Sequence, residues 1–185
     1  MIKSEVRAPV VVTDRLELWL PRPSDEAEMF AIVSHPETGR FLGPTTVRAE
    51  HVTRFQRGAG SWFLWGYGFF MVRLRGQHEV IGNCGVFRSY RGLGEDMDDK
   101  PEAGWIFAAG HVGKGYATEA MRAVLDWFDA EHGSQEIMCM IAPENAPSLG
   151  VARKLGFAPT RLATLPDGDE VQLLRREAAI SVERN

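Results

Sequence analysis

Hydrophobic positions along this chain recur with two periods, and these periods divide it into strands and helices. Leu16, Leu18 and Leu20 alternate with other residues, which predicts a strand over Val10–Leu20 with one buried face. Other short apolar runs, bounded by turn residues, predict further strands. These runs are Phe69–Leu74, Val80–Phe87, Trp105–Ala109, Glu136–Ala142, Phe157–Leu165 and Val171–Arg175.

The helical period is clearest after residue 115, where apolar side chains recur every three or four positions. The stripe consists of Ala117, Ala120, Met121, Val124, Leu125 and Phe128. It predicts a helix from Gly115 to about His132. Three shorter helices are predicted over Asp25–Ser34, over Ala49–Arg57 up to the stop signals Gly58 and Gly60, and from Asn145 through Leu155.

The order of these elements predicts a single-domain α+β (mixed α/β) layer fold. Early helices, a central hairpin, one strand–helix–strand unit and a late hairpin follow one another along the chain. The length of 185 residues is enough for one domain with a sizeable core. We expect a lead-in over residues 1–9, the domain over 10–178 and a tail over 179–185.

Composition and charge narrow the class of protein. A net charge of −4 argues against a general nucleic-acid binder, which usually carries a basic stripe. The sequence has no apolar run as long as a membrane span and no signal-peptide core at its start, so we expect a cytoplasmic protein with no membrane partner. Cys84 and Cys139 lie in apolar runs, which favours buried free thiols, and we expect no metal site.

The candidate chemistry begins between the strand at 105–109 and the long helix, in a glycine loop at residues 110–115. Backbone N–H groups at a helix start lack intrahelical partners, and Gly113 and Gly115 allow a phosphate to approach them. This pattern favours a pyrophosphate cradle, although glycines that only turn the chain remain an alternative. A nucleotide P-loop needs Ser or Thr after Gly-Lys and a glycine five residues before it, but this chain has Gly115 and Ala108 at those positions. A dinucleotide fingerprint needs a third glycine where this chain has Thr118.

Two other stretches have both a structural and a functional interpretation. Trp62 and Trp65 flank a glycine-rich, non-periodic region and either pack in the core or form a wall of an acceptor pocket. The polar loop at residues 88–100 contains four acidic residues. It is either a solvated loop or a surface that attracts a cationic amine.

Two segments carry a resemblance to the GNAT acyl-CoA-dependent N-acetyltransferases. Val112–Ala120 is similar to the family's pyrophosphate loop, (Gln/Arg)-x-x-Gly-x-(Gly/Ala). Asn145-Ala146-Pro147-Ser148 and Leu155-Gly156-Phe157 resemble the signature of the ribosomal-protein N-terminal acetyltransferase branch. The resemblance implies a central, mostly antiparallel twisted sheet that is splayed around the cofactor site and flanked by helices.

The resemblance also implies a reaction, in which acetyl-CoA donates its acetyl group directly to a primary amine of a protein N-terminus or small molecule, leaving CoA. We expect a monomer or homodimer. The residues implied in cofactor binding are Ile106, Phe107, Ala108, Gly113, Lys114, Gly115, Tyr116, Ala117, Thr118, Asn145 and Ser148. The backbone at 106–108 would supply an oxyanion donor.

Within this reaction Glu102 is the candidate general base and Ser148 the candidate donor to the departing thiolate. A strand-end glutamate and a helix-capping serine are the structural alternatives. Two departures from the family pattern matter: Val112 replaces a phosphate-holding Gln or Arg, and Ala152 replaces a tyrosine acid. The second departure leaves open a non-catalytic acyl-CoA-binding or sensing module.

Overall fold

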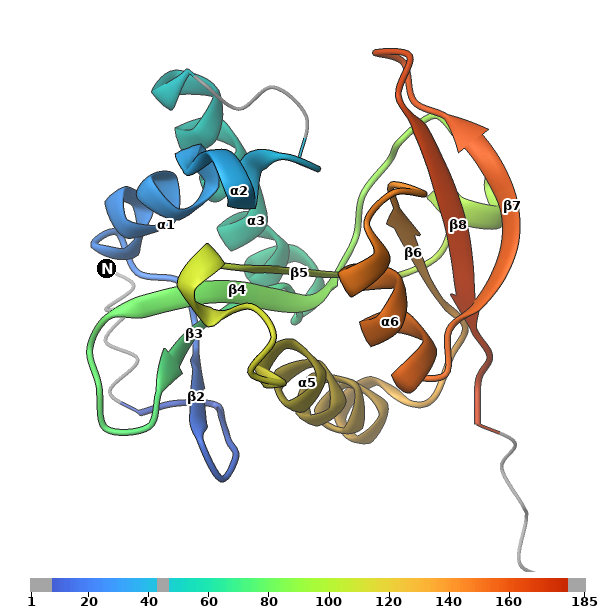
Figure 1. The fold of residues 1–185 in the computed structure, drawn as a ribbon. Coiled ribbons are helices and arrows are strands. Elements are labelled where there is room, and N and C mark those ends of the chain that lie inside the picture. The colour runs from blue at the N-terminus through green and yellow to red at the C-terminus, as the bar shows by residue number, and fades with distance from the viewer. Residues whose placement is uncertain (1–7, 43–46, 180–185) are drawn as a thin grey trace, which may run out of the picture.

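The computed structural model describes residues 8–42 and 47–179. The expected lead-in and tail therefore fall almost entirely outside the described residues. An eight-stranded sheet forms the centre of the molecule, in the order β1-β2-β3-β4-β5-β6-β8-β7 (Figure 1). The strands are β1 (Val11–Val12), β2 (Leu16–Trp19), β3 (Phe69–Leu74), β4 (Val80–Phe87), β5 (Glu102–Phe107), β6 (Ile137–Ile141), β7 (Ala158–Thr164) and β8 (Glu170–Arg176).

Helices cover both faces of this sheet, which confirms the predicted mixed α/β layer fold. Figure 1 shows α1, α2 and α3 on one side of β4 and β5, and α5 and α6 on the other. The helices are α1 (Asp25–Ser34), α2 (Pro36–Gly39), α3 (Arg48–Trp65), α4 (Glu95–Asp98), α5 (Tyr116–His132) and α6 (Ala146–Lys154), with a 3₁₀ turn at Ala109–His111. In the described parts of the chain, no helix is both long and apolar enough to cross a membrane.

The two faces of the sheet have separate cores. The larger core packs the apolar stripe of α5, including Met121, Val124 and Phe128, against the sheet. A smaller core packs Met29 and Ile32 of α1 against the opposite face. Cys84 and Cys139 are free and buried, as predicted, and burial raises the pKa of both thiols far above the ordinary range.

One pair of strands is parallel, and it separates almost at once. β5 and β6 are paired in register only at Glu102 and Met138. Beyond that point β5 stays with β4, while β6 pairs along its length with β8. The sheet is therefore splayed between β5 and β6, and α5 and α6 begin just after the carboxyl ends of these two strands. Ligands in α/β proteins commonly bind at such an edge.

The second predicted helix is longer than its sequence pattern indicates. We expected it to stop at Gly58, but α3 continues through Gly60 to Trp65 and ends at Gly66, whose φ of 76° is left-handed. Glycine weakens a helix interior by about 1 kcal/mol, which tertiary contacts of the last turns override. Ser61 Oγ donates to the carbonyl of Tyr67 at 2.8 Å, and Trp62 Nε1 donates to that of Phe69 at 2.9 Å.

Four smaller corrections concern short elements and element boundaries. The strand expected over Val10–Leu20 is two strands, because a turn forms in which Thr13 N–H donates to the Leu16 carbonyl at 2.9 Å. The segment after the helix predicted over Asp25–Ser34 contains the short helix α2, and the loop at 88–100 contains the short helix α4. The strand expected at Trp105–Ala109 begins earlier, at Glu102.

Candidate active site

The start of α5 presents backbone donors that the protein itself leaves unused. Gly113 and Gly115 have left-handed φ values of 80° and 81°, which turn the glycine loop into the helix. The N-cap residue is Gly115, which has no side chain to cap the first turn. The N–H groups of Tyr116, Ala117 and Thr118 accordingly have no acceptor among residues 8–42 and 47–179. Together with the helix dipole, they form an anion site.

Arg15, in the turn between β1 and β2, fixes the position of this helix start. Its Nη1 donates to the Lys114 carbonyl at 2.9 Å, and its Nε donates to Glu119 Oε2 at 2.6 Å. Thr13 Oγ1 donates to the other carboxylate oxygen of Glu119 at 2.6 Å. The Arg15 guanidinium also lies 4.6 Å from the centre of the Tyr116 ring. The glycine loop and the start of α5 are thus held from outside, while the N–H groups of Tyr116, Ala117 and Thr118 stay open.

The start of α6, in contrast, satisfies its own donors. Asn145 Oδ1 accepts from Ser148 N–H at 3.2 Å, as the predicted N-cap. Ala146 N–H donates to the Glu144 carbonyl at 2.9 Å, and Pro147 has no N–H. Ser148 occupies the first turn of α6, close after the carboxyl end of β6.

The edge of β5 that faces the splayed opening is defined by its hydrogen bonds. Ala108 N–H donates to the Ile81 carbonyl at 2.9 Å, toward β4, and is therefore not a free donor. Because successive peptide groups of a strand point in opposite directions, Ile106 also faces β4 while Trp105 and Phe107 face β6. Among the three residues predicted at this edge, Phe107 is thus the one whose N–H is directed at the opening.

Two surface grooves lie on either side of the sheet end. The larger, about 510 Å³, runs along the first turns of α5 and is lined by Arg15, Gly115, Thr118, Arg122 and Lys154, among others. The smaller, about 300 Å³, lies against α1 and includes Ala108 and Gly110. Neither of these two grooves is lined by Ser148, Trp62 or Trp65.

Glu102 is buried, 3% exposed, at the closed end of the splay. Its carboxylate accepts two hydrogen bonds from Arg91, at 2.7 and 3.0 Å, and one from the Ser89 hydroxyl. A general base at this position would receive its proton on an oxygen that already accepts hydrogen bonds. The role of Glu102 as a base stays a prediction, and no sequence pattern indicated its partner Arg91, eleven residues away.

Both tryptophans belong to the last turns of α3 and not to the non-periodic region expected there. Trp62 packs against Phe70, with ring centres 4.7 Å apart, and against Trp127, at 5.6 Å. This placement agrees with the core-packing alternative. Trp65 is 51% exposed, and the Arg88 guanidinium lies 5.4 Å from its ring centre.

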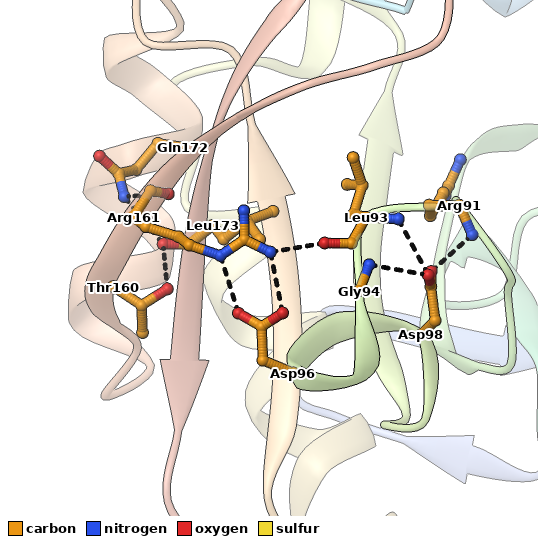
Figure 2. Close-up of polar contacts among 9 residues, drawn as sticks. All are labelled: Arg91, Leu93, Gly94, Asp96, Asp98, Thr160, Arg161, Gln172 and Leu173. Atoms are coloured by element: carbon orange, nitrogen blue, oxygen red, sulfur yellow. Dashed lines mark hydrogen bonds and ion pairs between the residues drawn. The ribbon is translucent and has the colours of Figure 1, made fainter.

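The acidic loop is neither simply solvated nor open to an amine at its central residues (Figure 2). Asp98 accepts the backbone N–H groups of Arg91, Leu93 and Gly94 at 2.7, 2.9 and 3.1 Å. Asp96 forms two hydrogen bonds of 2.8 Å with Arg161 of β7. Asp98 therefore orders the loop from within, and Asp96 attaches it to the late hairpin.

Comparison with known proteins agrees with this geometry. Residues 15–158 match the family described as the acetyltransferase (GNAT) domain. The protein YkkB of Bacillus subtilis is 28% identical over 157 residues, which are 80% of this chain and 84% of YkkB. A GNAT-family acetyltransferase structure from Bordetella pertussis is 32% identical, with a TM-score of 0.80 over 90% of this chain and 98% of its own.

A second structure is similar in fold alone. It is a ribosomal L7/L12 α-N-protein acetyltransferase, RimL, in complex with coenzyme A. Its TM-score is 0.71 at 16% identity, over 90% of this chain and 96% of its own. The match over most of the chain identifies the class of protein: the chain belongs to the GNAT acetyltransferase family.

Proposed function

We propose that this protein transfers an acetyl group from acetyl-CoA directly to a primary amine. The observation that carries the proposal is the trio of uncapped N–H groups at the start of α5, beside strands β5 and β6 that part after one residue pair. In the proposed complex the pyrophosphate lies on the N–H groups of Tyr116, Ala117 and Thr118, with Gly113, Lys114 and Gly115 forming the turn. The pantetheine arm extends into the opening between the strands.

The chain's own residues then have separate tasks. Phe107 N–H, directed into the opening, donates to the thioester oxygen as negative charge develops on it. The hydroxyl of Ser148 donates a hydrogen bond to the CoA thiolate as it leaves, and the Asn145 amide holds the pantetheine arm. Glu102, which lies five residues before Phe107 on β5, accepts the proton of the amine through intervening water. The relative RimL acts on a ribosomal protein, which makes a protein N-terminus one candidate acceptor.

The test is acetyl-CoA turnover over a panel of primary amines, measured as free CoA thiol and as acetylated product by mass spectrometry. We expect Ser148→Ala to lower kcat by about tenfold to a thousandfold with little change in the KM for acetyl-CoA. Ser134→Ala, in the exposed connection before β6, is the matched control. If the Ser148→Ala enzyme keeps the parental kcat, Ser148 has no role in the reaction.

A second pair of variants separates the two interpretations of Glu102. Glu102→Gln removes both the carboxylate and its ion pair, whereas Arg91→Gln removes the ion pair alone. If Glu102 is the base, kcat falls much further in Glu102→Gln than in Arg91→Gln. Equal losses in the two variants, together with equal losses of stability, would leave Glu102 with a structural role only.

One observation favours a second candidate, a non-catalytic acyl-CoA-binding or sensing module. Ala152, at the position where many relatives have a tyrosine acid, is fully buried in the larger core. Its methyl group has no proton to give to a thiolate. Calorimetric binding of acetyl-CoA with no acetylated product from any amine would support this second function and contradict the first.

A further inference from the structure

The larger groove, of about 510 Å³, begins at the anion site and continues along one face of α5. Gly115 and Thr118 line its near end, and the N–H of Thr118 is one of the three open donors. Arg122 and Asp126 line it further along, each one helical turn beyond the last. None of the described residues that line the groove belongs to β5 or β6, so the groove is separate from the opening between these strands.

Two cations from different helices line this groove without a counterion. Arg122 belongs to α5, and Lys154 is the last residue of α6. Neither side chain forms a hydrogen bond, an ion pair or a ring contact within residues 8–42 and 47–179. Arg15, the third cation of the groove, is already bound to Glu119. The positive charge that is available to a ligand therefore lies at positions 122 and 154.

The groove also contains carboxylates, and these distinguish it from a site for a simple anion. Arg15 already occupies the carboxylate of Glu119. Asp14 and Asp126 also line the groove, and in the described parts of the chain neither carboxylate is in an ion pair. They would repel a ligand that is anionic throughout. A ligand that combines a phosphate with hydroxyl and amino donors satisfies the cations and the carboxylates together, and a nucleotide has this combination.

The position of the groove relative to the anion site limits which nucleotide can occupy it. In CoA the pyrophosphate joins the pantetheine arm on one side to an adenosine with a 3′-phosphate on the other. With the arm between β5 and β6 and the pyrophosphate at the Thr118 N–H, the adenosine continues into the groove. One ribose separates its 3′-phosphate from the pyrophosphate, and one helical turn separates Arg122 from Thr118.

We infer that Arg122 and Lys154 bind the 3′-phosphate of the acetyl donor, and that through them the protein selects acetyl-CoA over acetyl-dephospho-CoA. This inference rests on the proposed function and adds the residues that determine donor specificity. The guanidinium of Arg122 can hold a phosphate with two parallel hydrogen bonds, and the ammonium of Lys154 contributes a point charge from the other helix. The pyrophosphate and the 3′-phosphate then have separate partners, main-chain N–H groups for the first and side chains for the second.

The experiment compares CoA with dephospho-CoA, which lacks only the 3′-phosphate. Calorimetry gives the two dissociation constants, and the acetylated forms of both are compared as donors to one amine. We expect CoA to bind about tenfold or more tightly than dephospho-CoA. In transfer, the difference should lie in KM with kcat nearly unchanged, because the 3′-phosphate is remote from the thioester and is bound equally throughout the reaction.

Variants then assign the preference to the two cations. Arg122→Gln and Lys154→Gln should each reduce the ratio of the two dissociation constants by about threefold, and the double variant should remove the preference. The affinity for dephospho-CoA should stay at its parental value in all three. Arg153→Gln is the matched control, because Arg153 is an exposed cation next to Lys154 that does not line the groove. Thermal melting of each variant checks that it remains folded.

The outcomes distinguish this inference from the proposed function. Equal binding of CoA and dephospho-CoA, or a preference that survives the double variant, would overturn the inference while leaving acetyl transfer intact. A preference that depends on Arg122 and Lys154, with no acetylation of any amine, would support the 3′-phosphate site and contradict the transferase. Failure of the parental protein to bind either nucleotide would contradict both.

Discussion

Two helices begin at the same edge of the sheet, and their first turns differ in one respect. At α6, the side chain of Asn145 and the carbonyl of Glu144 accept the available N–H groups, and Pro147 removes one. At α5, the N-cap is a glycine, and three successive N–H groups have no acceptor in the described parts of the chain. α5 is therefore prepared for an external anion, and α6 is complete without one.

The difference teaches how the same local geometry can serve binding or structure. Orphan N–H groups weaken a helix start, and the fold compensates at α5 with contacts from outside the helix, through Arg15, Thr13 and Glu119. Arg15 and Thr13 reach the carbonyl side of the loop and the outer face of the helix. The donors themselves stay available to a ligand.

The largest effect that we expect is the loss of acetyl-CoA affinity when a side chain blocks the N–H groups at the start of α5. Gly115→Val places a β-branched side chain at a φ of 81°, a strained conformation, and brings its Cβ within 3.4 Å of Arg15 Nη2. Acetyl-CoA affinity, measured by calorimetry, should fall about a hundredfold or more because several charge-assisted hydrogen bonds are lost.

The control for this substitution is Gly133→Val, at the other end of α5. Gly133 also has a left-handed φ, 78°, and open space around it. Both variants should lose comparable stability through strain, but only Gly115→Val should lose acetyl-CoA binding. Parental affinity in a folded Gly115→Val protein would show that the helix start does not hold the pyrophosphate.

The next largest effect is on stability, and it comes from the contacts of Glu119 that support α5 from outside the helix. Burial by itself raises the pKa of Glu119, but hydrogen bonds from Thr13 and Arg15, with the charge of Arg15, outweigh it and hold the pKa below its ordinary value of 4.5. A carboxyl whose pKa is lowered on folding stabilises the fold above its unfolded pKa, and this stabilisation is lost as pH falls below about 4.5. Glu119→Gln should lose about 1–2 kcal/mol of stability at neutral pH.

Urea denaturation at pH 7 and at pH 3 measures this contribution. The difference between wild type and Glu119→Gln should shrink on going to the lower pH, because the carboxyl of the unfolded wild-type chain then binds a proton and part of the stabilisation is lost. Glu131→Gln, an exposed glutamate near the end of α5, is the matched control. A difference that stays constant between the two pH values would argue against an ionic role.

Asn145 offers a smaller effect, and two substitutions separate its roles. Asn145→Ala removes the cap and should destabilise the protein by about 1 kcal/mol. Asn145→Asp keeps the capping oxygen and should retain most of that stability, but it lacks the amide N–H proposed for pantetheine. The KM for acetyl-CoA should rise in both variants. Equal destabilisation of the two would mean that the observed cap is not what holds α6.

Sequence patterns predicted the parts of this molecule whose determinants are local. The helical stripe of α5, the glycines of the loop before it and the Asn145 cap each depend on neighbouring residues, and the structure has all three. The course of α3 beyond Gly58 could not be predicted, because Ser61 and Trp62 form their hydrogen bonds only once β3 is in place.

The backbone donors of the site could be predicted from the sequence, but the pairs formed by its side chains could not. Arg15 and Glu119 are 104 residues apart in the sequence, and neither position alone indicates the other. Arg91 comes from a loop whose pattern suggested either solvent exposure or attraction of a cationic amine, and it meets Glu102 because β4 and β5 pair in this register. Such contacts follow from the tertiary fold, which a single sequence does not display.

The smallest effect that we predict concerns Lys114, whose exposed side chain stands beside the same donors. If backbone N–H groups hold the pyrophosphate, Lys114→Gln should weaken acetyl-CoA binding by less than about threefold at physiological salt, because exposed charges are screened there. The residual effect should lie in the association rate and disappear at high salt, as stopped-flow measurements can show. Arg153→Gln, an exposed cation of α6 outside the groove beside α5, is the matched comparison. A large loss of affinity in Lys114→Gln that persists at high salt would show that the lysine side chain, and not the main chain, holds the pyrophosphate. The difference between the starts of α5 and α6 would then have no functional meaning.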